Sequence, residues 1–171
     1  MDLCISEINK GRLKSALSVV FVFLLLCSNL CGASSSSSII RQKRAYLVKT
    51  AKQYIGAPYK YGSSGPKSFD CSGFVSFLMR KCFYIKLPRS SPDIYAVCKK
   101  INKKDIEIGD LVFFSSGGAS DIFHVGIYIG GNKFISALST GSRKGVQVSV
   151  LNGSYWKSKY YAAGRVLPSG R

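Results

Sequence analysis

The sequence predicts an α+β fold in which N-terminal helices pack on an antiparallel sheet of about five to six strands. Two observations carry this prediction. Before Gly109 the apolar residues recur with helical spacing, whereas after it the chain breaks into short segments rich in β-branched and aromatic residues. Helices that precede strands, rather than alternate with them, are typical of α+β and not of α/β proteins.

The N-terminal residues 1–33 have the pattern of a secretory signal peptide. Three basic residues precede a twelve-residue, predominantly apolar stretch at 16–27, and small residues stand before a cut after Ala33. The apolar stretch is too short for a stable transmembrane helix, so we expect export. Two alternatives stay open. The segment could remain as an uncleaved anchor, or a cut before Cys31 could allow its acylation, although Leu30 stands where that cut prefers a small residue.

Beyond the leader, residues 34–44 are rich in serine and basic side chains, which favours a linker. One domain is expected over residues 45–168, followed by a short tail at 169–171. Its length is enough for a single hydrophobic core.

The charge balance is strongly basic, with 25 Lys and Arg against 8 Asp and Glu. Residues 1–33 hold three basic and two acidic residues, so an exported chain keeps 22 against 6, a net charge of +16. Such a field attracts polyanions. For an exported protein these are the cell wall and the anionic envelope surface, and no nucleic acid is expected. Solvated surface charge without a partner explains the composition equally well.

Three of the six cysteines follow the leader: Cys71, Cys82 and Cys98. An odd number leaves at least one thiol free in a monomer, which we expect here. Cys82 and Cys98 could form a disulfide or be buried as small apolar side chains. With a single histidine and no CxxC pair, the sequence disfavours a zinc site, and neither a metal nor a cofactor is expected.

Three helices are expected before Gly109. The first, over residues 44–56, has its apolar residues four apart and ends at a glycine. The second begins with Asp70 as its N-cap, which places Cys71 in the first turn of a mostly buried helix. The third is short, with Ser91 as its cap and Pro92 at its first position.

Five strands are expected after Gly109, and a tight hairpin turn in "IGGNK" joins the second to the third. In "GVQVSVL" the valines alternate, so that they share one face of the sheet. The five segments are "DLVFF", "HVGIYIG", "KFISAL", "GVQVSVL" and "YYAAGRVL".

Cys71 and His124 are the candidate reactive pair. The N-terminus of a helix carries partial positive charge and unpaired N–H groups, which stabilise a thiolate. We therefore expect a lowered pKa for Cys71, with a nearby strand histidine completing an ion pair and serving as general base and then acid. The alternative is a core cysteine and an ordinary polar histidine.

Four blocks in the same order resemble the NlpC-type family of bacterial cell-wall cysteine peptidases, which are papain-like α+β domains. The resemblance runs from about Tyr46 to Val166. Ile108 stands where the family has proline. The blocks are "AKQYIGAPYKYGSSGPKSFDCSGFVSFLMRK", "LPRSSPDIY", "IEIGDLVFFSS" and "HVGIYIGGNKFISA".

The resemblance implies roles for individual positions. Cys71 matches the nucleophile and His124 the general base, while the substrate groove would be lined by Tyr59, Asp70, Ser72 and Arg89.

One position departs from the family. Twelve residues after its base the family usually has a third polar residue, most often histidine, which orients the imidazole. Here that position is Ser136. Because serine is shorter, we expect it to reach the imidazole only through a water or not at all.

The resemblance also implies an activity. It is hydrolysis of amide bonds in peptidoglycan stem peptides, with the bond between D-glutamate's γ-carboxyl and a diamino acid as the usual target, in the periplasm or cell envelope of a bacterium. A wall-binding domain without catalysis, or an amidase that cuts another wall amide, are the alternatives.

Overall fold

The computed structural model describes residues 36–141 and 144–170 of the chain. The predicted signal peptide lies outside the described residues. A helix covers residues 36–52, and therefore includes most of the segment that was expected to be a linker. The unit that contains the candidate site begins at Ile40. No helix in the described part of the chain is both long and apolar enough to cross a membrane.

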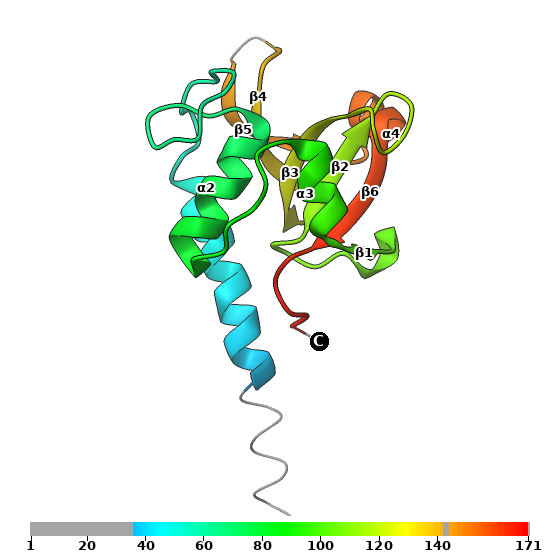
Figure 1. Ribbon diagram of the computed structural model, residues 1–171. Coiled ribbons are helices and arrows are strands. Elements are labelled where there is room, and N and C mark those ends of the chain that lie inside the picture. The colour runs from blue at the N-terminus through cyan, green and yellow to red at the C-terminus, as the bar shows by residue number, and fades with distance from the viewer. Residues whose placement is uncertain (1–35, 142–143, 171) are drawn as a thin grey trace, which may run out of the picture. The chain divides into compact units, whose positions relative to one another are not determined.

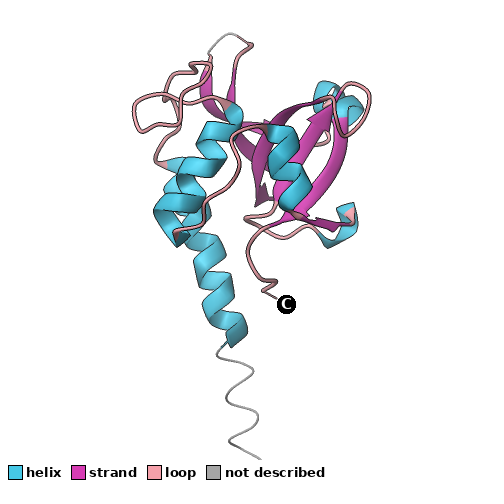
Figure 2. Cartoon of the chain, viewed as in Figure 1, coloured by secondary structure: helices cyan, strands magenta, loops and turns pink. Residues whose placement is uncertain are grey.

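Six antiparallel strands form one sheet in the order β1-β6-β2-β3-β4-β5 (Figures 1 and 2), which confirms the predicted α+β class. Gly131 and Asn132 form the expected hairpin turn between β3 and β4, and both have positive φ, 57° and 59°. The strands are β1 Lys99–Ile101, β2 Leu111–Ser115, β3 Ile122–Gly130, β4 Lys133–Leu138, β5 Gly145–Val150 and β6 Tyr160–Arg165.

The short edge strand β1 was not predicted from the sequence. It has only three residues, two of them lysines, so it shows no apolar alternation. Its conformation comes from pairing with β6, where Lys100 faces Gly164. The 3-10 turn Lys103–Asp105 and the helix α4, Ser154–Lys159, were also missed, because segments of three to six residues are too short to show a periodic signal.

Helix α2, Cys71–Phe83, begins as predicted, with Asp70 accepting a hydrogen bond from the Gly73 N–H. Helix α3, Ser91–Val97, differs by one residue from the prediction. Its N-cap is Ser90, whose hydroxyl accepts the Asp93 N–H, and Ser91 is the first helical residue. The hydroxyl of Ser91 is therefore available for another contact.

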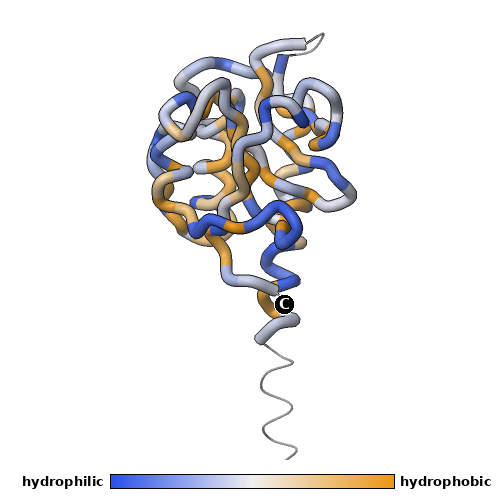
Figure 3. The backbone as a smooth tube through the Cα atoms, turned by 90° about the vertical axis from the view of Figure 1, so that its right-hand side faces the viewer, coloured by the Kyte–Doolittle hydropathy of each residue, from blue (hydrophilic) through white to orange (hydrophobic). Residues whose placement is uncertain are grey.

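The two faces of the sheet pack against different helices. Helices α2 and α3 share one face, where α2 lies against β3 and β4 and α3 lies against β3. Helix α4 lies against β2 on the other face. In β2, Leu111 and Phe113 belong to the core on the α2 side, whereas Val112 and Phe114 belong to a smaller cluster that includes Trp156 of α4. This is the period of two that a strand imposes on its side chains. Accordingly, Figure 3 shows hydropathy alternating over short lengths along much of the chain.

A buried ionic cluster joins the first helix to the sheet and to the C-terminal segment. Arg44 donates to Asp110 Oδ1 at 2.9 Å and to the carbonyl oxygen of Pro168 at 2.9 Å. Arg165 donates to Asp110 Oδ2 at 2.7 Å. Glu107 accepts hydrogen bonds from Ser169 and Gly170, so the predicted tail is bonded to the domain. We refer to Arg44, Glu107, Asp110 and Arg165 as the ionic cluster.

Candidate active site

Cys71 is the first residue of α2 and is buried at the point where α2, α3 and β3 meet. Its Sγ lies 3.8 Å from Ser91 Oγ and 4.0 Å from the carbonyl oxygen of Phe123. The Asp70 carboxylate bonds to the Gly73 N–H at 2.7 Å and thereby fixes the first turn of α2. The helix cap places the sulfur at the start of α2, and tertiary packing places strand β3 against the sulfur.

The expected lowering of the Cys71 pKa is wrong for this structure. Burial raises the pKa of the thiol above its ordinary value, which outweighs the opposing hydrogen bonds from the Ser91 hydroxyl and from the backbone of Val125 and Ser72. A buried thiolate loses its hydration, and none of the described side chains forms an ion pair with the sulfur. Cys71 is therefore a thiol at pH 7.

His124 lies on β3, directly between the two residues whose backbones contact the Cys71 sulfur. Its Nε2 is 2.9 Å from Ser136 Oγ on the neighbouring strand β4. The expectation that serine is too short to reach the imidazole is therefore wrong. In the structure β3 and β4 bring the two residues close enough for a direct hydrogen bond.

Aromatic side chains enclose the His124 ring. Its centroid lies 5.0 Å from that of Trp156, 5.9 Å from Phe114 and 6.5 Å from Phe134. Burial among these rings lowers the pKa of His124 to about 3, so the imidazole is neutral at pH 7. The predicted Cys71–His124 ion pair is thus not present. Among the described residues, the Cys71 sulfur bonds to groups on either side of His124 and not to the imidazole itself.

The other predicted site residues gather around Cys71. Tyr59, Asp70, Ser72 and Arg89 line one hollow with it, of about 330 Å³. His124 is not part of that lining. The sequence did not predict the role of several further lining residues, including the exposed aromatic rings of Tyr61 and Phe123.

An ion pair between Asp70 and Arg89 forms part of the wall of this hollow. Arg89 also donates to Ser72 Oγ at 2.8 Å, which links both neighbours of Cys71 to one guanidinium group. Burial alone would raise the pKa of Asp70, but the hydrogen bonds from Arg89, Gly73 and Gly62 lower it below its ordinary value. Burial raises the pKa of Tyr59, so its phenol stays a hydrogen-bond donor at pH 7.

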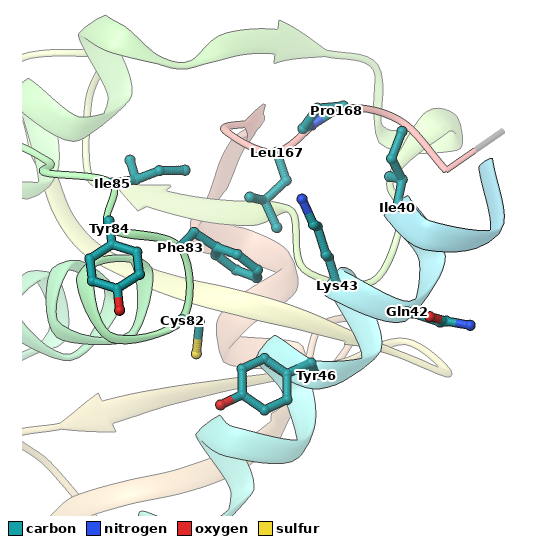
Figure 4. Close-up of a pocket in the computed structure, with 10 residues that line it drawn as sticks. All are labelled: Ile40, Gln42, Lys43, Tyr46, Cys82, Phe83, Tyr84, Ile85, Leu167 and Pro168. Carbon is teal, nitrogen blue, oxygen red and sulfur yellow. The ribbon is translucent and has the colours of Figure 1, made fainter. Parts of the chain in front are cut away.

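A second, more apolar hollow lies between the first helix, the end of α2 and the C-terminal segment (Figure 4). It measures about 600 Å³, and its lining includes Tyr46, Phe83 and Leu167. Cys82 also faces it.

Cys71, Cys82 and Cys98 are all free thiols, so the structure contains no Cys82–Cys98 disulfide. No group of three or more potential metal ligands occurs in the described ranges.

The fold and the site define a class of protein. A cysteine at the start of a helix faces a histidine strand of an antiparallel sheet, which is the papain-like arrangement. Residues 56–165 match the NlpC/P60 family, and the chain belongs to that family. The family predicted from the four sequence blocks is thereby confirmed.

Three similar proteins illustrate the relationship. The γ-DL-glutamyl hydrolase of Bacillus subtilis is 43% identical over 114 residues, which are 66% of this chain and 27% of that protein. The murein DD-endopeptidase MepS/murein LD-carboxypeptidase of Escherichia coli is 44% identical over 124 residues, 72% and 63% of the two chains. The crystal structure of an NlpC/P60 family protein from Bacillus cereus superposes with a TM-score of 0.67 at 30% identity. The superposition covers 73% of this chain and 40% of that one. The chain therefore spans less than two thirds of each.

Proposed function

We propose that this protein is a cysteine peptidase that hydrolyses amide bonds in peptidoglycan stem peptides, with the D-γ-glutamyl–diamino acid bond as the target. The observation that carries the proposal is the position of Cys71. Its thiol lies in the wall of a polar hollow, at a helix start, against the histidine strand. The names of the two relatives, a γ-DL-glutamyl hydrolase and a murein endopeptidase, support this substrate class.

Cleavage would begin when substrate enters the hollow and brings the Cys71 thiol and the His124 imidazole, which are not bonded to each other in the structure, into hydrogen-bond contact. The neutral imidazole would then accept the Cys71 proton. The thiolate attacks the carbonyl carbon, and N–H groups at the start of α2 stabilise the oxyanion. The tetrahedral intermediate collapses to a thioester, while the imidazolium returns the proton to the departing amine. A water molecule, deprotonated by His124, then hydrolyses the thioester and restores the thiol. Ser136 would hold the imidazole through Nε2 during both proton transfers.

The hollow is suited to an anionic peptide. Arg89 remains half exposed although it pairs with Asp70, so its guanidinium retains donors that face solvent. The net positive charge of the whole chain adds a long-range attraction for acidic stem peptides.

The experiment is digestion of defined muropeptides, with products identified by mass spectrometry. Wild-type protein should release fragments cut at the γ-glutamyl bond, and Cys71→Ala should lose at least about 10⁴-fold in rate. Cys82→Ala, which removes a thiol from the other hollow, is the matched control and should retain activity. Full activity in Cys71→Ala would refute the proposal, and binding without cleavage by the wild type would instead favour a wall-binding domain.

Export is a separate proposal, supported by the signal-peptide pattern of residues 1–33. Mass spectrometry of the protein from its native cells should give an N-terminus at Ser34. An N-terminus at an acylated Cys31 would favour the lipoprotein alternative, and an intact leader would favour an anchor.

A further inference from the structure

Ser91 is a buried polar residue that the fold itself does not require. Its exposed fraction is 6%, and α3 already has an N-cap in Ser90. A hydroxyl group buried without a partner destabilises a protein. In the described chain, the partner of this hydroxyl is the Cys71 sulfur, at 3.8 Å. A serine here is therefore explained by what it does for the thiol.

We propose that Ser91 is a positioning residue, which donates a hydrogen bond to the Cys71 sulfur and favours its ionised, attacking form. The catalytic part of this inference rests on the proposed function. The effect on the thiol does not, because it can be measured without a substrate.

The surroundings of the sulfur give Ser91 a distinct role. The carbonyl oxygen of Phe123, 4.0 Å away, can only accept a hydrogen bond and so favours the protonated thiol. The Ser91 hydroxyl can donate, and a donor favours the thiolate. The two groups belong to different elements, α3 and β3, and both contact the first residue of α2. Removing the hydroxyl should therefore shift the balance towards the thiol.

The electrostatics of the site agree with this geometry. Burial raises the pKa of Cys71, and among the groups that oppose the increase the Ser91 hydroxyl contributes most, ahead of the backbone of Val125 and Ser72. Asp70, next in sequence, raises the pKa further through its negative charge. A single hydroxyl is thus the main side-chain contribution in favour of the nucleophile.

The test is the pH dependence of Cys71 alkylation by iodoacetamide, with the label on Cys71 quantified by peptide mass spectrometry so that Cys82 and Cys98 do not interfere. Ser91→Ala should raise the thiol pKa and slow labelling at pH 7 by about three- to tenfold, the usual worth of one hydrogen bond. Ser91→Thr keeps the hydroxyl and should stay within about twofold of wild type.

Ser90→Ala is the matched control. Ser90 borders the same hollow, but its hydroxyl bonds to Asp93 and not to the sulfur, so its loss should leave the Cys71 profile unchanged. An unchanged profile in Ser91→Ala, or equal slowing in both variants, would overturn the inference. If Ser91→Ala does not fold, the nearly isosteric pair Ser91→Thr and Ser91→Val provides the same comparison.

Activity gives a second readout. With muropeptides, Ser91→Ala should lower kcat, because the hydroxyl lies against the attacking sulfur. If the wild type cleaves no muropeptide and the alkylation shift is still observed, the proposed function fails and the inference about Ser91 stands.

Discussion

The ionic cluster and the candidate active site are two buried polar regions of the same domain. They differ in how far the charges of their titratable groups are neutralised by ion pairs. In the cluster, Asp110 is fully buried between Arg44 and Arg165, whose side chains are 1% and 10% exposed. In the site, the Asp70 side chain is nearly buried, but its partner Arg89 is 48% exposed. Within the described ranges Cys71 and His124 form no ion pair, and both are neutral at pH 7.

The difference separates a structural from a functional use of buried polar groups. The ionic cluster compensates its charges fully and connects the first helix, the sheet and the C-terminal segment. The site leaves its reactive groups without compensation, so a ligand or a proton transfer can change their state. A buried group whose hydrogen bonds and charge are already satisfied within the protein has no capacity left to bind a substrate or exchange a proton with it.

The largest effect is expected from breaking the ionic cluster. Asp110→Asn leaves two buried guanidinium groups without a full counter-charge, so the free energy of unfolding should fall by about 3–5 kcal/mol. Urea denaturation measures the loss. A loss below about 1 kcal/mol would mean that the cluster is not the permanent structural element that we infer.

The pH dependence of stability should isolate His124, the single histidine of the chain. Its pKa is about 3 when folded against 6.5 as the ordinary value, so below pH 6.5 the unfolded state binds a proton that the folded state does not. Stability should therefore fall as pH drops from about 6.5, by up to about 1.4 kcal/mol per pH unit. The difference between wild type and His124→Gln, measured by urea denaturation from pH 7 to pH 5, should show this slope. A constant difference would contradict it.

Ser136→Ala should test how the imidazole is held. It removes the partner of His124 Nε2, and we expect kcat to fall about tenfold while KM changes little. Since the chain has one histidine, its NMR signals report the tautomer directly, and the variant should lose the preference seen in wild type. Unchanged kcat and unchanged imidazole signals together would show that Ser136 only fills space.

The smallest effect on stability is expected at Asp70. Asn is also a good N-cap, so Asp70→Asn should cost only about 1 kcal/mol, well below the loss in Asp110→Asn. The pKa of Asp70 is lower in the folded protein than its ordinary value. Its contribution to the free energy of unfolding is therefore fully present above the ordinary pKa and is lost as the pH falls through the folded-state pKa. Thermal unfolding at pH 7 compares the two variants. Equal losses would remove the distinction between the two carboxylates.

Local signals in the sequence were enough for most of the fold. The five strands predicted after Gly109 all occur, because alternation and β-branched residues specify half-buried strands without help from distant residues. The Asp70 cap and the position of Cys71 were also predicted, since capping involves only neighbours in sequence. Segments without such signals, β1 and α4, take their structure from what they pack on, and the sequence did not reveal them.

The sequence by itself determined which residues could react: one cysteine at a helix start, one histidine on a strand and the family blocks around them. Only the tertiary structure decided the state of those groups. Burial makes Cys71 a thiol and His124 a neutral imidazole, and strand pairing brings Ser136 within 2.9 Å of the ring. The packing of α3 on α2 places Ser91 against the sulfur. Desolvation and contact distance depend on residues far apart in the chain, and a linear pattern does not contain them.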